Sequence, residues 1–174
     1  MNVKTLCMIG LTLALLCGSA FAQSDNMGVV DTLTLTVEKY APNKWVVKAD
    51  FWNDEEIAAF DIPLKYTAGM TKLTVDSVSH AGTRVDYFAQ KYQQVDTTGQ
   101  MMHFGGLAYI GSDKPPLAPG SGEIGRVYIS TAGGANADNI VVDTVFFAPN
   151  NKMLFVDRNA KAIIPALIIQ TAKK

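Results

Sequence analysis

The stretch that decides the fold is residues 45–66, WVVKADFWNDEEIAAFDIPLKY. Apolar and polar side chains alternate along residues 45–52 and again along residues 57–66, with the polar run 53–56 between them. Successive side chains of a strand point to opposite faces, so a period of two places the apolar ones on a single face. The stretch therefore predicts two β-strands joined by a turn, each with one face in a core. Pro63 cannot donate a hydrogen bond to a neighbouring strand, which predicts that the second strand lies at a sheet edge or bends there.

Short segments of the same kind continue through the rest of the chain. They are residues 32–37, 73–78, 101–110, 125–131, 140–147, 152–156 and 163–169. Turn residues separate them, and no long stretch has the period of a helix. This pattern of about nine strands predicts an all-β fold, a single β-sandwich. The expected parts are a flexible lead-in (23–30), one domain (31–169) and a C-terminal tail (170–174).

The first 22 residues have the pattern of an export signal. Lys4 gives a positive start, residues 6–16 form an apolar run, and Ala20 and Ala22 fit a small-x-small cleavage site. The run is shorter than the ~20 residues that span a bilayer. Cleavage after Ala22 would release the protein into the periplasm or outside the cell, with no membrane insertion afterwards.

The composition of the exported part excludes several classes of protein. Removing residues 1–22 from the 174 leaves 152. Cys7 and Cys17 are removed with them, so no disulfide and no thiol nucleophile remain. Lys4 is removed as well, so the 15 Lys and Arg of the chain become 14 against 16 Asp and Glu, which lacks the basic excess of proteins that bind nucleic acid. A domain of this size without disulfides must depend on its hydrophobic core.

No arrangement of residues typical of an enzyme is present in the sequence. His80 and His103 lack the spacing of a zinc site, and we interpret both as structural. The carboxylates of residues 54–56 are adjacent on a turn, where we expect them to diverge and to be solvated, unlike the paired carboxylates of a glycosidase. We therefore predict a protein that is not an enzyme and has no cofactor. A structural calcium ion is left open, although no calcium-loop motif is present.

Aromatic residues are the candidates for binding a sugar. Carbohydrate-binding modules stack pyranose rings on flat rows of aromatic side chains. The candidates are Trp52, which points outward from its predicted strand, and Tyr87, Tyr92 and Tyr109. A platform needs three rings on one face. Tyr87 and Phe88 would point to opposite faces if they lay on a strand, so the spacing leaves this role open rather than indicating it.

The order of these patterns resembles that of the cohesin-type β-sandwich, which is related to a group of carbohydrate-binding modules. The segments that carry the resemblance are 31–35 (DTLTL), 51–66 (FWNDEEIAAFDIPLKY), 73–79 (LTVDSVS), 120–129 (GSGEIGRVYI), 143–147 (DTVFF) and 154–160 (LFVDRNA). Together they extend over most of residues 31–165. The resemblance implies a jelly-roll sandwich of about nine strands.

The resemblance also implies a function. Cohesins of the well-known kind bind dockerin modules in extracellular assemblies, so the resemblance implies a secreted, non-catalytic module that binds a dockerin-like protein through one sheet face. We expect that face to use outward side chains of the second and third strands, namely Lys48, Asp50, Asp61 and Lys65. The alternative is a module that binds a polysaccharide through Trp52 and neighbouring tyrosines.

Overall fold

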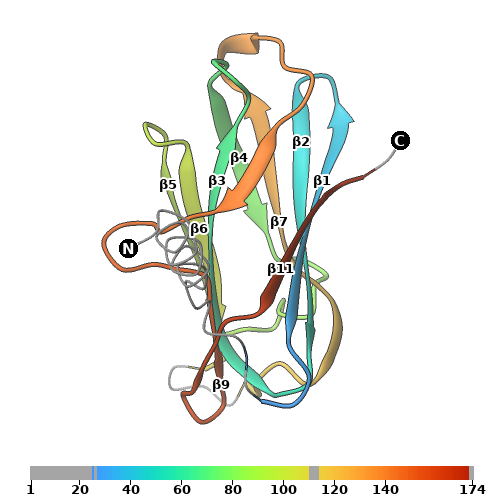
Figure 1. Cartoon of the computed structure of the whole chain (residues 1–174), viewed down its shortest axis with the longest axis vertical. Coiled ribbons are helices and arrows are strands. Elements are labelled where there is room, and N and C mark those ends of the chain that lie inside the picture. Colours follow the sequence, from blue (N-terminus) through green and yellow to red (C-terminus); the bar gives the residue numbers. More distant parts are fainter. Residues whose placement is uncertain (1–24, 26, 110–113, 173–174) are drawn as a thin grey trace, which may run out of the picture.

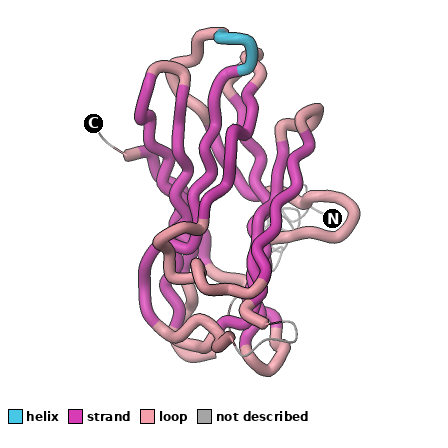
Figure 2. Tube along the Cα trace, turned by 180° about the vertical axis from the view of Figure 1, so that it is seen from behind, coloured by secondary structure: helices cyan, strands magenta, loops and turns pink. Residues whose placement is uncertain are grey.

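A computed structural model describes residues 25, 27–109 and 114–172 (Figure 1). The predicted export signal, residues 1–22, lies outside the described residues. The described part forms two β-sheets packed face to face, and its one helical element is a short 3-10 turn, η1 (Ala132–Gly134) (Figure 2). It contains no helix with the length and apolar character needed to cross a membrane. The prediction of an all-β sandwich is confirmed.

Sheet A has five strands. In order across the sheet they are β11 (Ala166–Thr171), β1 (Thr32–Ala41), β2 (Lys44–Asn53), β7 (Gly120–Thr131) and β4 (Leu73–Ser79). Neighbouring strands are antiparallel except β11 and β1, which run parallel. The sheet therefore joins the first and the last strands of the described chain. β11 runs past the expected end of the domain at Ile169.

Sheet B lies opposite sheet A and is antiparallel throughout. In order its strands are β10 (Ala162–Ile163), β9 (Leu154–Asp157), β3 (Ile57–Thr67), β6 (Met101–Leu107) and β5 (Gln90–Asp96). A further strand, β8 (Val141–Thr144), pairs with β3 alone. β3 is therefore the central strand of this sheet.

The central position of β3 corrects the sheet-edge expectation drawn from Pro63. β3 pairs with β9 as far as Asp61 and with β8 from Leu64 onward. Pro63 lies between these two partners, at the point where one neighbouring strand ends and the other begins. A proline is tolerated there because the ladder on that side is interrupted at its position.

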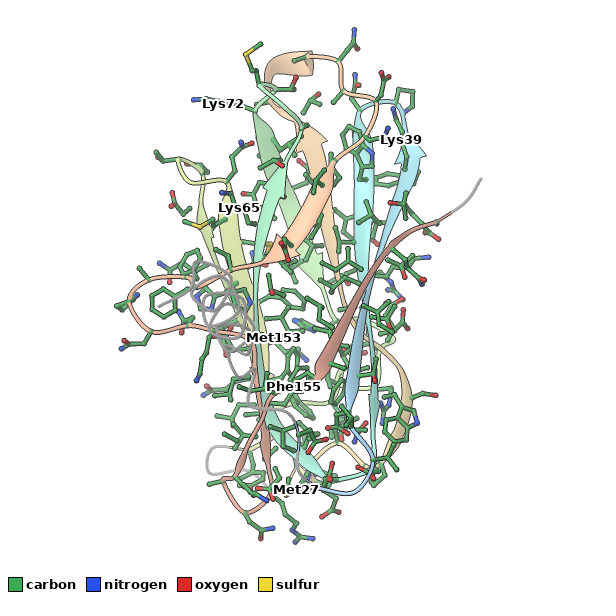
Figure 3. The ribbon with its side chains drawn as sticks, viewed as in Figure 1. Met27, Lys39, Lys65, Lys72, Met153 and Phe155 are labelled. Atoms are coloured by element: carbon green, nitrogen blue, oxygen red, sulfur yellow. The ribbon has the colours of Figure 1, made fainter. Side chains whose placement is uncertain are left out.

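The core lies between the two sheets and follows the predicted alternation. Its fully buried large side chains include Trp45, Phe51, Ile62, Leu64, Tyr66, Phe104, Ile124 and Phe155. Phe155 of β9 (labelled in Figure 3) stacks on Phe51 of β2, with ring centroids 4.1 Å apart, and on Phe60 of β3 at 5.8 Å. These contacts connect sheet A with sheet B through one aromatic side chain.

Candidate functional site

The sandwich presents two outer faces, one on each sheet. β2 belongs to sheet A and β3 to sheet B (Figure 1). The alternation of buried positions places Lys48, Asp50 and Trp52 on the outer face of sheet A, and Asp61 and Lys65 on the outer face of sheet B. The expectation that these residues share one face is therefore wrong, because β2 and β3 are consecutive in sequence but belong to opposite sheets. A part for each of them in binding stays a prediction.

Two ion pairs lie on the outer face of sheet A. Nζ of Lys48 on β2 lies 2.6 Å from Oε2 of Glu38 on β1, and Nε of Arg126 lies 2.5 Å from Oε1 of Glu123, both on β7. The acidic partner raises the pKa of Lys48 above its ordinary value. The charges of these four side chains are therefore already matched within the sheet.

The outer face of sheet B has a hydrogen-bonded centre that joins β3, β6 and β5. Nδ1 of His103 lies 2.9 Å from Oδ1 of Asp61, and its Nε2 lies 3.3 Å from Oε1 of Gln94. Phe147 covers the imidazole, with ring centroids 4.7 Å apart, and both rings are buried. Burial raises the pKa of Asp61 above its ordinary range, although His103 opposes the shift. The network fixes the positions of these side chains on the face.

Tyr92 extends this centre towards the edge strand β5. It lies opposite Gly105 of β6, and its Oη donates a hydrogen bond to the carbonyl oxygen of Phe60 at 3.2 Å. Burial raises the pKa of Tyr92 to about 12, so the hydroxyl stays a donor at neutral pH. The residue is nevertheless 42% exposed, which leaves part of it available to a partner.

Two exposed apolar side chains lie on or just after β8, the strand that pairs with β3. Val141 on β8 is 67% exposed, and Phe146, next to the buried Phe147, is 59% exposed. Phe146 and Phe147 begin the loop that projects from the side of sheet B in Figure 1. We name the following residues the sheet B face: Asp61, Lys65, Tyr92, Gln94, His103, Val141, Phe146 and Phe147.

The predicted aromatic candidates do not form a platform of three rings. Trp52 lies on sheet A and Tyr92 on sheet B, so they face opposite sides of the molecule. Tyr87 is half-buried and its hydroxyl donates to the carbonyl of Pro116 at 3.0 Å, while Phe88 is buried. Tyr109 is 39% exposed and follows β6. At most two of the candidates therefore remain for any single face.

Sequence reasoning missed part of the sheet B face. Gln94, Val141, Phe146 and Phe147 were not candidates, and His103 was interpreted only as structural. His103 is indeed buried, yet it lies at the centre of an outer face because Phe147 covers it. The adjacent Phe146 and Phe147 before a proline were the one available signal, since two consecutive aromatics in an extended segment cannot both face the core.

One groove of about 500 Å³ opens at the end of sheet A, between β1, residues 138–140 and the end of β11. Lys39 extends over the ring of Trp45 there, with Nζ 5.2 Å from the ring centroid. The same Nζ donates to the carbonyls of Ala137 and Asp138. Nζ of Lys39 therefore already has its contacts within the protein, and we do not assign the groove a function.

Replacing Gly105 with alanine is expected to lower the free energy of unfolding by about 1–3 kcal/mol. A Cβ at this position would lie 2.3 Å from the carbonyl oxygen of Phe60 and 2.4 Å from Oη of Tyr92. Tyr92 can rotate away, but the backbone oxygen of the central strand cannot. Urea unfolding checks the prediction, with Gln93→Ala, an exposed position on β5, as a control of about 0.5 kcal/mol or less. Equal unfolding midpoints for the two variants would contradict it.

Comparison with known proteins places this arrangement among solved structures. No family model matches the sequence, and no curated protein matches it. The OlpA cohesin of Clostridium thermocellum, solved in complex with a dockerin, matches with a TM-score of 0.62 and 10% identity. The match covers 83% of this chain and 100% of that chain. The sixth cohesin of scaffoldin B from Acetivibrio cellulolyticus, solved with a Cel5 dockerin, matches with a TM-score of 0.60 and 16% identity. The match covers 83% of this chain and 100% of that chain. A non-cellulosomal cohesin from the archaeon Archaeoglobus fulgidus matches with a TM-score of 0.53 and 13% identity, over 83% of this chain and 93% of that chain.

The two sheets pack into a β-sandwich whose outer sheet surfaces are open to solvent. Within that class, the chain has the cohesin-like fold, as its similarity to bacterial and archaeal cohesins shows. The fold expected from the resemblance is confirmed.

Proposed function

We propose that this protein is an exported, non-catalytic binding module that recognises a dockerin-like protein module through the sheet B face. Export follows from the predicted signal of residues 1–22. The solved cohesins of similar fold include several in complex with dockerins, which supports a partner of that class. A non-catalytic role agrees with His103, whose described hydrogen-bond partners are Asp61 and Gln94 rather than a nucleophilic hydroxyl.

The composition of the sheet B face is the reason for proposing this surface as the binding site. Protein interfaces are rich in aromatic side chains and poor in charged ones at their centre, with polar residues at the rim. The sheet B face has Tyr92, Phe146 and Val141 exposed, together with the hydrogen-bonded Asp61–His103 pair. The outer face of sheet A, by contrast, has internal ion pairs along its middle strands.

Substitutions on the sheet B face are expected to weaken binding of a dockerin module by about tenfold or more, which corresponds to about 1.4 kcal/mol. The test variants are Val141→Glu and Lys65→Glu. The first introduces a negative charge at an exposed apolar position of that face, and the second reverses the charge at another exposed position. Isothermal titration of the purified protein against a panel of dockerin modules gives the dissociation constants.

The matched controls lie on the outer face of sheet A. Ile168→Glu on β11 introduces the same charge at an exposed aliphatic residue, and Lys44→Glu on β2 reverses the same charge. Both should bind as the unchanged protein does. Equal losses on both faces, or no binding by any dockerin of the panel, would overturn the proposal, and binding of a polysaccharide instead would favour the carbohydrate alternative.

A further inference from the structure

Acidic side chains from three segments converge at one end of the sandwich, away from the sheet B face. Carboxylate oxygens of Asp25 in the lead-in, Asp31 before β1 and Glu55 in the β2–β3 turn all lie within 4.8 Å of one another. Asp54, the neighbour of Glu55 in the turn, lies close enough for its carboxylate to repel those of Asp31 and Glu55. Met27, labelled at the lower end of the molecule in Figure 3, marks this position.

Asp31 is the most deeply buried member of this carboxylate cluster. It is 0% exposed, and its Oδ1 accepts a hydrogen bond from the backbone N–H of Asp54 at 3.2 Å. Its Oδ2 is buried and has no hydrogen-bond partner among the described residues. A buried carboxylate oxygen without a partner costs free energy. A ligand bound to Oδ2 would remove this cost, and the surrounding protein groups supply no such partner.

Asp54 and Glu55 have the same deficiency. Oδ2 of Asp54 accepts from the N–H of Val29 at 2.7 Å, whereas its Oδ1 is buried without a partner, as is Oε2 of Glu55. Within the part of the chain that the structure describes, no Lys, Arg or His forms an ion pair with any acid of the cluster. Asp31 and Asp54 thus each have one oxygen held by the backbone and one left free.

The cluster is electrostatically unfavourable by itself. Burial, with the neighbouring carboxylates adding to it, raises the pKa of Asp31 to about 6 and that of Glu55 to about 7. A positive charge among these oxygens would remove the repulsion and would replace the lost hydration.

We propose that Asp25, Asp31, Asp54 and Glu55 bind one Ca²⁺ ion. Ca²⁺ takes about 6–8 oxygen ligands in flexible geometry, which suits several carboxylates completed by water. The cluster contains no nitrogen or sulfur donor of the kind that zinc prefers. The ion ties the lead-in to the start of β1 and to the turn before β3, and it does not depend on the proposed dockerin-binding function.

Calcium titration of the full chain tests this inference. After removal of metals with EDTA, calorimetry with CaCl₂ is expected to give one site per chain, and the thermal unfolding midpoint is expected to rise with Ca²⁺ concentration. Glu55→Gln removes one charge of the site and is expected to weaken Ca²⁺ binding by about tenfold or more, while Asp31→Asn should abolish it. Glu55→Gln keeps the test valid if Asp31→Asn does not fold.

The matched control is Glu56→Gln, the same substitution one residue further along the turn. The carboxylate of Glu56 pairs with Arg158 at 2.5 Å rather than with the cluster, so this variant should keep the Ca²⁺ affinity of the unchanged protein. The inference would be overturned by absence of both a binding signal and a midpoint shift, or by equal losses in the two glutamine variants. An equal response to Mg²⁺ would overturn the assignment to calcium.

Discussion

Replacing Phe155 with alanine is expected to lower the free energy of unfolding by about 3–5 kcal/mol. Phe155 is fully buried, and its ring stacks on Phe51 of sheet A and on Phe60 of sheet B. Truncation removes the buried ring and leaves a cavity between the sheets, and the lost aromatic contacts add to this cost. Because Phe155 contacts both layers, relaxation of one strand cannot fill the space.

Urea unfolding followed by fluorescence and by circular dichroism measures this loss. Phe155→Leu, which keeps most of the volume, should lose considerably less than the alanine variant. Phe146→Ala removes the same ring from an exposed position and is expected to change the free energy of unfolding by about 0.5 kcal/mol or less. If Phe146→Ala and Phe155→Ala had the same effect, the central position of Phe155 in the core would be refuted.

The strands of residues 45–66 could be predicted because alternation reports which side of a strand is buried. Trp45 and Phe51 are in the core of the structure, as expected, and so are Phe60 and Leu64. Alternation does not report to which sheet a strand belongs. The turn at residues 53–56 carries the chain from sheet A to sheet B, and this crossing separates the predicted binding residues onto opposite faces.

The carboxylate cluster could not be predicted for a related reason. Adjacent acids at residues 54–56 were expected to diverge into solvent, and Glu56 does point to Arg158 at the surface. Asp54 and Glu55 are half-buried instead, because Asp25 and Asp31 lie against the same turn. Contacts between segments more than twenty residues apart leave no periodic trace in the sequence.

The segment between β4 and β5 contains a half-buried arginine, Arg84. The guanidinium of Arg84 donates to the carbonyl oxygens of Phe51 at 2.8 Å, Gly120 at 3.0 Å and Ala118 at 2.7 Å, and to Oδ1 of Asn53 at 3.0 Å. Desolvation lowers the pKa of Arg84 from its ordinary value, but arginine remains charged at physiological pH. One side chain thereby connects the end of β2 with the proline-rich loop before β7.

Replacing Arg84 with methionine is therefore expected to lower the free energy of unfolding by about 3 kcal/mol or more, since a single hydrogen bond to a charged group contributes about 1.5–3 kcal/mol. Methionine keeps much of the apolar volume but leaves several acceptors without their donor. Arg84→Lys restores the charge without the planar fork and should recover only part of the loss. Arg158→Met breaks an exposed ion pair with Glu56 and should cost about 1 kcal/mol or less in the same urea unfolding measurement. Full recovery by lysine would show that charge alone matters, whereas equal losses for Arg84→Met and Arg158→Met would show that the four contacts of Arg84 do not stabilise the fold.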